Sequence, residues 1–175
     1  MPTLRTAFVQ TDFESTREYS EVSSISDQLL DHLNMPEARD LLKAANLPGL
    51  SSGMVQATFA RFSDDLGFVR EAKGLFAAYE NKALRPDFYL DLGGTGILME
   101  VERGKTTTNN MDLLDLWKCH LCEHAHYLFL MVPQALMHNP TMKPKKEYAS
   151  VVKRLGSFFM TRNYTNVRAL HVFGY

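Results

Sequence analysis

The strongest constraint on the fold is a glycine-rich break between two alternating runs, within residues 86–105. The first run covers residues 87–92, the second covers residues 97–103, and the sequence GGTG separates them. Apolar and polar side chains alternate in each run, as expected for a strand with one apolar face. Two alternating runs around a glycine-rich break are typical of a β-hairpin.

The hairpin pattern also predicts which side chains meet across the strands. A turn that is symmetric about residues 94 and 95 gives the pairs Leu92–Ile97, Tyr89–Glu100 and Asp87–Glu102. A slip by one residue would move carboxylates to the apolar face, so this register is favoured over its neighbours. Opposed side chains have Cβ atoms about 5 Å apart and diagonal ones roughly 7–8 Å, which would gather Asp87, Glu100 and Glu102 into an acidic cluster.

An acidic cluster of this kind is typical of a site for a hard metal ion. Carboxylates that close repel one another unless a cation lies between them or one of them is protonated. Oxygen ligands favour ions such as Mg²⁺, and Mn²⁺ can take the same ligands. The sequence therefore predicts a Mg²⁺ site, with Mn²⁺ as a substitute ion.

The residues around this cluster resemble a known nuclease motif. Asp87 directly after Pro86, followed by Glu100-Val101-Glu102 on the next strand, resembles the PD-(D/E)XK nuclease superfamily, which has the restriction-endonuclease-like fold. Glu102 stands where that family usually has lysine, which is similar to the E-x-E variant of some restriction enzymes. The resemblance covers roughly residues 65–175.

The resemblance implies a set of catalytic roles. Asp87 and Glu100 would hold the metal ion, with the backbone carbonyl of Val101 as an additional ligand. Glu102 would orient or deprotonate the attacking water. Lys105, just past the acids, is a candidate for the positive charge that Glu102 does not provide. The helix before the motif strands often supplies another acid in this family, and Glu71 is the best-placed candidate, with an exposed helical glutamate as the alternative.

Basic residues later in the chain are candidates for contacts to nucleic acid. Lys143, Lys145 and Lys146 lie in the loop before the predicted helix at 147–160, and Lys153 and Arg154 follow on that helix. Short basic runs near a metal site are typical of phosphate contacts, and a solvated lysine loop is the alternative. Lys118, within a predicted helix at 111–123, either points towards the acids or is a solvated lysine. Asp112 and Asp115 in the first turns of that helix favour its dipole.

The order of elements predicts an α/β fold with a mixed sheet flanked by helices. After a helix at 64–82 come the hairpin, the helix at 111–123, a buried strand at 127–132, a helix at 147–160 and a strand at 166–173. This order resembles the restriction-endonuclease-like core, although one early strand of that core has no clear counterpart in the pattern. A hairpin turning at Lys73-Gly74 is the alternative to the helix at 64–82.

Residues 1–63 are predicted to form an N-terminal arm and a small helical lobe ahead of a nuclease-like core at 64–175. A strand is expected at 5–10, with helices at 24–34, at 37–45 and from residue 51. The three helices would form either a helix-turn-helix, with 51–61 as the recognition helix, or a helical subdomain packed on the core.

Composition limits the partners and the compartment. The net charge of −1 gives no overall basic surface, so any DNA contact must be local. No apolar run approaches the roughly 20 residues of a membrane span, and no signal-peptide pattern is present, so we expect no membrane partner. Cys119 and Cys122 favour a reducing cytoplasm over a disulfide framework. Together with His126 they could hold zinc, and buried cysteines are the alternative.

Taken together, these features predict a Mg²⁺-dependent DNA endonuclease similar to type II restriction enzymes. Its substrate would be double-stranded DNA, and cutting both strands would need a homodimer with two sites. The alternative is a non-catalytic DNA-binding or protein-interaction module on the same fold, which the glutamate at position 102 and the near-neutral charge favour.

Overall fold

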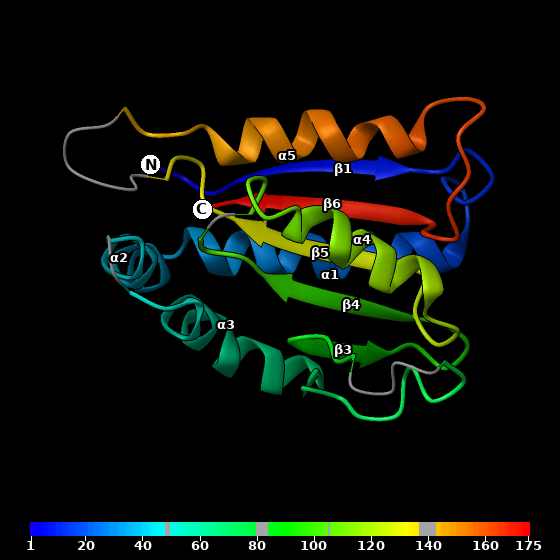
Figure 1. Cartoon of the computed structure of the whole chain (residues 1–175). Coiled ribbons are helices and arrows are strands. Elements are labelled where there is room, and N and C mark those ends of the chain that lie inside the picture. Colours follow the sequence, from blue (N-terminus) through cyan, green and yellow to red (C-terminus); the bar gives the residue numbers. More distant parts are fainter. Residues whose placement is uncertain (48–49, 80–83, 105, 137–142) are drawn as a thin grey trace.

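A six-stranded sheet with helices on both faces forms the protein (Figure 1). The computed structural model describes residues 1–47, 50–79, 84–104, 106–136 and 143–175, with the backbone alone at Arg61. From one edge of the sheet to the other, the strands are β1 (Leu4–Val9), β6 (Ala169–Gly174), β5 (Tyr127–Val132), β4 (Gly96–Val101), β3 (Phe88–Asp91) and β2 (Val69–Arg70). Strands β4, β5 and β6 are parallel, and the remaining three are antiparallel to their neighbours. The α/β class and the mixed sheet are therefore confirmed.

Helices cover the two faces of the sheet in separate layers. On one face lie α1 (Arg17–Asn34), α2 (Pro36–Ala45) and α3 (Ser52–Leu66), and on the other lie α4 (Met111–Leu121) and α5 (Glu147–Gly156), which a short 3-10 helix (Ser157–Phe159) follows. Strands β5 and β6 are buried along their whole length, because a central parallel strand is covered on both faces. None of the helices in the described ranges is long and apolar enough to cross a membrane.

The N-terminal residues belong to the same sheet and core as the rest of the chain. β1 pairs with β6, close to the predicted strand at 5–10. α1 begins at Arg17, earlier than predicted, because the Thr16 side chain accepts a hydrogen bond from the Tyr19 N–H (3.1 Å). The boundary predicted after residue 63 falls inside α3, whose Val55 and Phe59 pack in one core with Phe88. The helix-turn-helix stays a prediction.

The helix predicted at 64–82 is wrong beyond Leu66. Gly67 adopts a left-handed conformation (φ 83°) and ends α3, and the Phe68 N–H donates to the Ser63 carbonyl (2.9 Å). The chain then forms β2, which pairs with β3, and continues in turns to residue 79, whereas residues 80–83 lie outside the described part. No hairpin turns at Gly74 among the described residues. β2 is a two-residue strand ahead of the hairpin that the sequence pattern did not show.

Candidate functional site

The hairpin forms as predicted, but its register differs by two residues. Tyr89 pairs with Leu98 and Leu90 with Ile97, instead of the predicted Tyr89–Glu100 and Leu92–Ile97 pairs. The Leu92 N–H donates to the Thr95 carbonyl (2.9 Å), which centres the turn on Gly93 (φ 78°) and Gly94. Glycine adopts this positive φ readily, whereas threonine does not. A shift of two residues keeps each side chain on its face, so the predicted division into faces holds.

Asp87, Glu100 and Val101 are joined by hydrogen bonds across the two strands. The Val101 N–H donates to Asp87 Oδ2 (2.8 Å), and the Asp87 N–H donates to Glu100 Oε2 (3.3 Å). Extending the observed register places Pro86 opposite Val101. Proline has no N–H to donate to the Val101 carbonyl, so that oxygen is left open to another ligand. The three residues predicted as metal ligands therefore lie together.

Helix α4 adds two charged residues to this group. The Lys118 ammonium lies 2.6 Å from Glu100 Oε1 and 3.0 Å from Asp115 Oδ1. The side chains of Lys118, Glu100 and Asp115 are 9%, 4% and 1% exposed, so the interpretation of Lys118 as a solvated lysine is wrong. Residues three apart on a helix share a face, and α4 turns this face towards β4. The sequence marks Asp115 only as an acid that favours the helix dipole.

Glu102, Glu71 and Gln56 surround the same group. The backbone of Glu102 is fixed by its N–H, which donates to Met131 (2.8 Å), and by its carbonyl, which accepts from the Tyr175 hydroxyl (2.9 Å). Glu71 is exposed and its N–H donates to the Asp87 carbonyl (3.1 Å), so it lies beside Asp87, at the end of β2 and not on a helix. Gln56 on α3, which sequence reasoning missed, lies near enough to Asp87 to counter part of the burial-driven rise in the pKa of that carboxyl.

We refer to Asp87, Glu100, Glu102, Asp115 and Lys118 as the acidic centre. Burial raises the pKa of Glu102 to about 8, and the nearby charges of Asp115 and Asp87 add to this rise. Burial likewise raises the pKa of Asp87, Glu100 and Asp115. Burial opposes the charge of Lys118, but Glu100 and Asp115 outweigh it and raise the pKa of the ammonium. One ammonium does not balance four carboxyl groups, so the centre favours an additional proton or cation.

The donor atoms of the acidic centre fit a hard metal ion in chemistry, although they do not yet form a complete ligand set. Among the described residues, no three Asp, Glu, His or Cys side chains are arranged to hold a metal ion. Glu100 Oε1 and both carboxylate oxygens of Asp115 are nevertheless buried without a hydrogen bond, although Lys118 lies within ion-pair distance. Buried carboxylate oxygens with open coordination positions are what Mg²⁺ or Mn²⁺ requires. Lys105, the remaining catalytic candidate, lies outside the described residues.

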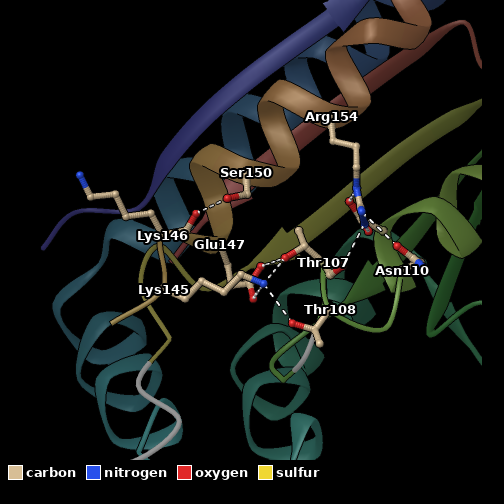
Figure 2. Close-up of polar contacts among 9 residues, drawn as sticks. Thr107, Thr108, Asn110, Lys145, Lys146, Glu147, Ser150 and Arg154 are labelled. Carbon is tan, nitrogen blue, oxygen red and sulfur yellow. Dashed lines mark hydrogen bonds and ion pairs between the residues drawn. The ribbon is translucent and has the colours of Figure 1, made fainter. Parts of the chain in front are cut away.

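Two of the five basic candidates form internal contacts, shown in Figure 2. Lys145 lies 3.1 Å from Glu147 Oε1 and donates to Thr107 (2.5 Å) and Thr108 (3.0 Å). Arg154 is bound through its guanidinium to the carboxylate of Asp112 and also donates to Asn110 and Thr107. We call this group the loop–α5 cluster: Thr107, Thr108, Asn110, Asp112, Lys145, Glu147 and Arg154.

The remaining three basic candidates lie at the surface. Lys143, Lys146 and Lys153 are exposed. In Figure 2 the Lys146 side chain extends away from the loop–α5 cluster. These three lysines therefore remain candidates for contacts to phosphate.

The positions of Cys119, Cys122 and His126 do not support the predicted zinc site. Cys119 and Cys122 are buried, and the thiol of Cys119 faces the Ala125 carbonyl (3.9 Å). His126 Nδ1 is instead hydrogen-bonded to Thr95 Oγ1 (2.7 Å). Within the described ranges these side chains do not form a metal-binding group, so the two cysteines belong to the core.

Comparison with known proteins adds no family assignment. No family model matches the sequence, and no curated protein matches it either. The motif residues and the geometry of the acidic centre are therefore the basis for any functional conclusion.

Proposed function

We propose that the protein is a Mg²⁺-dependent endonuclease that hydrolyses phosphodiester bonds in double-stranded DNA. The observation that carries the proposal is the excess of acids in the acidic centre, where Lys118 is the single cation beside four carboxyl groups and where Glu100 Oε1 and both carboxylate oxygens of Asp115 are buried without a hydrogen bond. Burying such an excess of like charge is costly, and groups with strongly raised pKa values concentrate at functional sites. The motif resemblance and the additional strand β2 support a restriction-endonuclease-like core.

Asp87, Glu100 and the Val101 carbonyl would hold the ion. The two hydrogen bonds that join these residues keep their oxygens in a fixed relation before an ion arrives. A divalent ion bound there would lower the pKa of a water molecule and neutralise charge on the phosphate. Gln56 and Glu71 would orient Asp87 from either side.

Glu102 would accept the proton of the attacking water. Its pKa of about 8 lies near neutrality, which suits a group that must both take and release a proton. A cation close by lowers this pKa and so produces the ionised base. The hydrogen bonds of the Glu102 backbone to Met131 and Tyr175 hold the carboxyl group at the end of β4.

The substrate and the assembly belong to the same proposal. The exposed lysines Lys143, Lys146 and Lys153 would contact backbone phosphates, which are the main source of affinity for DNA. A homodimer would bring one centre to each strand of the duplex. A cytoplasmic location would keep Cys119 and Cys122 reduced.

Cleavage of supercoiled plasmid in Mg²⁺ or Mn²⁺ tests the proposal. We expect the wild type to cut and the Asp87→Ala/Glu100→Ala variant to be inactive. A matched control is Glu37→Ala/Asp40→Ala, which removes two exposed acids on α2 and should cut normally. If the wild type neither cuts nor gains thermal stability with Mn²⁺, the proposal is wrong.

A second candidate function is a binding module on the same fold that does not cut DNA. The observation that favours it is the Lys118 ion pair with Glu100, which occupies a carboxylate that the metal would need. Stabilisation by Mn²⁺ together with DNA binding but without cleavage of varied DNA substrates would support this function instead.

A further inference from the structure

Lys118 occupies the place in the acidic centre where a cation is most needed. Its ammonium lies between two buried carboxylates, 2.6 Å from Glu100 and 3.0 Å from Asp115. Leu116 and Cys119 on either side of it in sequence are buried against the sheet, so α4 holds the base of the Lys118 side chain in place. The lysine is therefore built into the core and does not reach the acids from solvent.

We propose that Lys118 on α4 supplies the positive charge that is missing at position 102, and that it does so by exchanging Glu100 for the scissile phosphate. This inference rests on the proposed function. Without metal, Lys118 neutralises Glu100 and Asp115. When a metal ion occupies Glu100, Lys118 leaves that carboxylate, stays bound to Asp115 and turns its ammonium to the scissile phosphate. Lys118 thus competes with the ion for Glu100 and then acts as a catalytic group, whereas Asp115 is a positioning residue.

Electrostatics favours the first part of this change. Mg²⁺ binds a carboxylate oxygen at about 2.0–2.1 Å. The ammonium is already 2.6 Å from Glu100 Oε1, and Glu100 Oε2 accepts the Asp87 N–H. Two cations on one carboxylate would repel strongly in a buried site. Lys118 and the ion therefore compete for Glu100.

Asp115 explains why Lys118 would remain in the site after it leaves Glu100. Asp115 lies on the same helix, three residues before Lys118, so the distance between the two backbones does not change. Its Oδ2 is buried without a hydrogen bond, which leaves room for a second contact to the ammonium. The flexible four-carbon stem of lysine allows the ammonium to pivot about this carboxylate.

Two other basic side chains, Arg103 and Arg154, are bound to groups outside the acidic centre. Arg103, which directly follows Glu102, donates to the carbonyls of Ala45, Leu47 and Leu50. Arg154 is bound to Asp112. Lys118 is the cation whose charge acts on Asp87, Glu100 and Glu102 alike. It is therefore the group suited to stabilise charge on a phosphate beside them.

Calorimetric titration of the full chain with Mn²⁺ tests the competition without relying on cleavage. Lys118→Met removes the competing cation, so we expect roughly tenfold tighter Mn²⁺ binding together with loss of cleavage. Lys118→Arg keeps the charge and binds carboxylates through two hydrogen bonds, so we expect Mn²⁺ binding weaker by about fivefold or more. Lys43→Met, an exposed lysine on α2, is the matched control and should bind Mn²⁺ as the wild type does.

The two variants keep the inference testable even if one of them does not fold. Lys118→Met leaves Glu100 and Asp115 without their cation and can unfold for that reason, whereas Lys118→Arg retains both ion pairs and decides the question alone. Mn²⁺ binding by a folded Lys118 variant that matches the wild type would overturn the inference and leave the proposed function standing. Failure of the wild type to bind Mn²⁺ would overturn the proposed function itself.

The role of Asp115 has its own test. Asp115→Asn keeps the ligands of the ion but weakens the tether of Lys118, so we expect Mn²⁺ affinity within about threefold of wild type and kcat lowered by roughly tenfold or more. Loss of Mn²⁺ binding as complete as in Asp87→Ala/Glu100→Ala would make Asp115 a metal ligand and would overturn its positioning role.

Discussion

The acidic centre and the loop–α5 cluster both bury charge beside α4, but they balance that charge differently. In the loop–α5 cluster, Lys145 is paired with Glu147 and Arg154 with Asp112. Both acids are fully buried, and the threonines of residues 106–110 complete the contacts. Each charge there has an opposite partner, so the cluster fastens the segment after β4 to α5.

The acidic centre lacks this balance and therefore costs stability. Lys118 is its one cation, and burial together with mutual repulsion raises the pKa of Asp87, Glu100, Glu102 and Asp115. A chain that needed only a folded core would gain stability from a smaller number of acids here. Balanced buried charge is typical of a structural contact, whereas an excess of buried acids over cations marks a candidate functional site.

Breaking a pair in the balanced cluster should give the largest change in stability. Arg154→Met leaves the buried carboxylate of Asp112 without its cation, so we expect the free energy of unfolding to fall by about 3–5 kcal/mol. Urea denaturation measures this loss. Asp112→Asn/Arg154→Met removes both charges and should recover a large part of it. An equal fall in the free energy of unfolding in the single and double variants would show that the unpaired Asp112 carboxylate does not cause the loss of stability.

Adding a cation should stabilise the unbalanced centre. Mn²⁺ at about a hundredfold excess over its Kd should raise the free energy of unfolding by about 2.7 kcal/mol. Thermal melting with and without Mn²⁺ measures the change. Asp87→Ala/Glu100→Ala should abolish it, and Arg154→Met should retain it although that variant is less stable. A gain that survives in Asp87→Ala/Glu100→Ala would place the ion elsewhere.

Removing one acid from the unbalanced centre should stabilise the protein at high pH. The folded pKa of Glu102, about 8, lies above the usual value, so the folded state holds a proton that the unfolded state has lost. Stability from this group is present below pH 4.5 and is lost as the pH rises to 8. Glu102→Gln should therefore be more stable than wild type at pH 8, by on the order of 1–2 kcal/mol, and equal to it near pH 4.5.

Denaturation curves across this pH range measure the effect of Glu102→Gln, with Glu123→Gln, at an exposed position, as the control. A pH-independent difference between Glu102→Gln and wild type would contradict the raised pKa. The same variant should lose cleavage, because glutamine cannot accept a proton from water.

The sequence predicted the parts of the site that depend on local patterns. Alternation in residues 87–92 and 97–103 determines the hairpin and the face of each acid. The register was wrong by two residues because a shift of two preserves alternation, so the turn decides between registers. The choice depends on which residue adopts positive φ, and Gly93 does so more readily than Thr95.

The parts that depend on contacts between distant elements could not be predicted. β2 has two residues, too few to produce a period, and its pairing with β3 is what defines it. Lys118 and Lys145 look like surface lysines in the sequence, and only the packing of α4 and α5 on the sheet brings each to a buried acid. Gln56 comes near Asp87 for the same reason, since α3 packs on the hairpin through Phe59 and Phe88.

The exposed lysines belong to neither cluster, and their substitution should have the smallest effect on stability. Lys143→Gln, Lys146→Gln and Lys153→Gln together should change the free energy of unfolding by less than about 0.5 kcal/mol. If each contacts one phosphate, the slope of log K for DNA against log salt should fall by roughly 0.9 for each lysine. Filter binding at several salt concentrations measures the slope, and Lys43→Gln/Lys73→Gln is the control at exposed lysines elsewhere. An unchanged slope would mean that DNA approaches the acidic centre from another side. The basic residues around α5 would then act only through Lys145 and Arg154, as structural partners of buried acids.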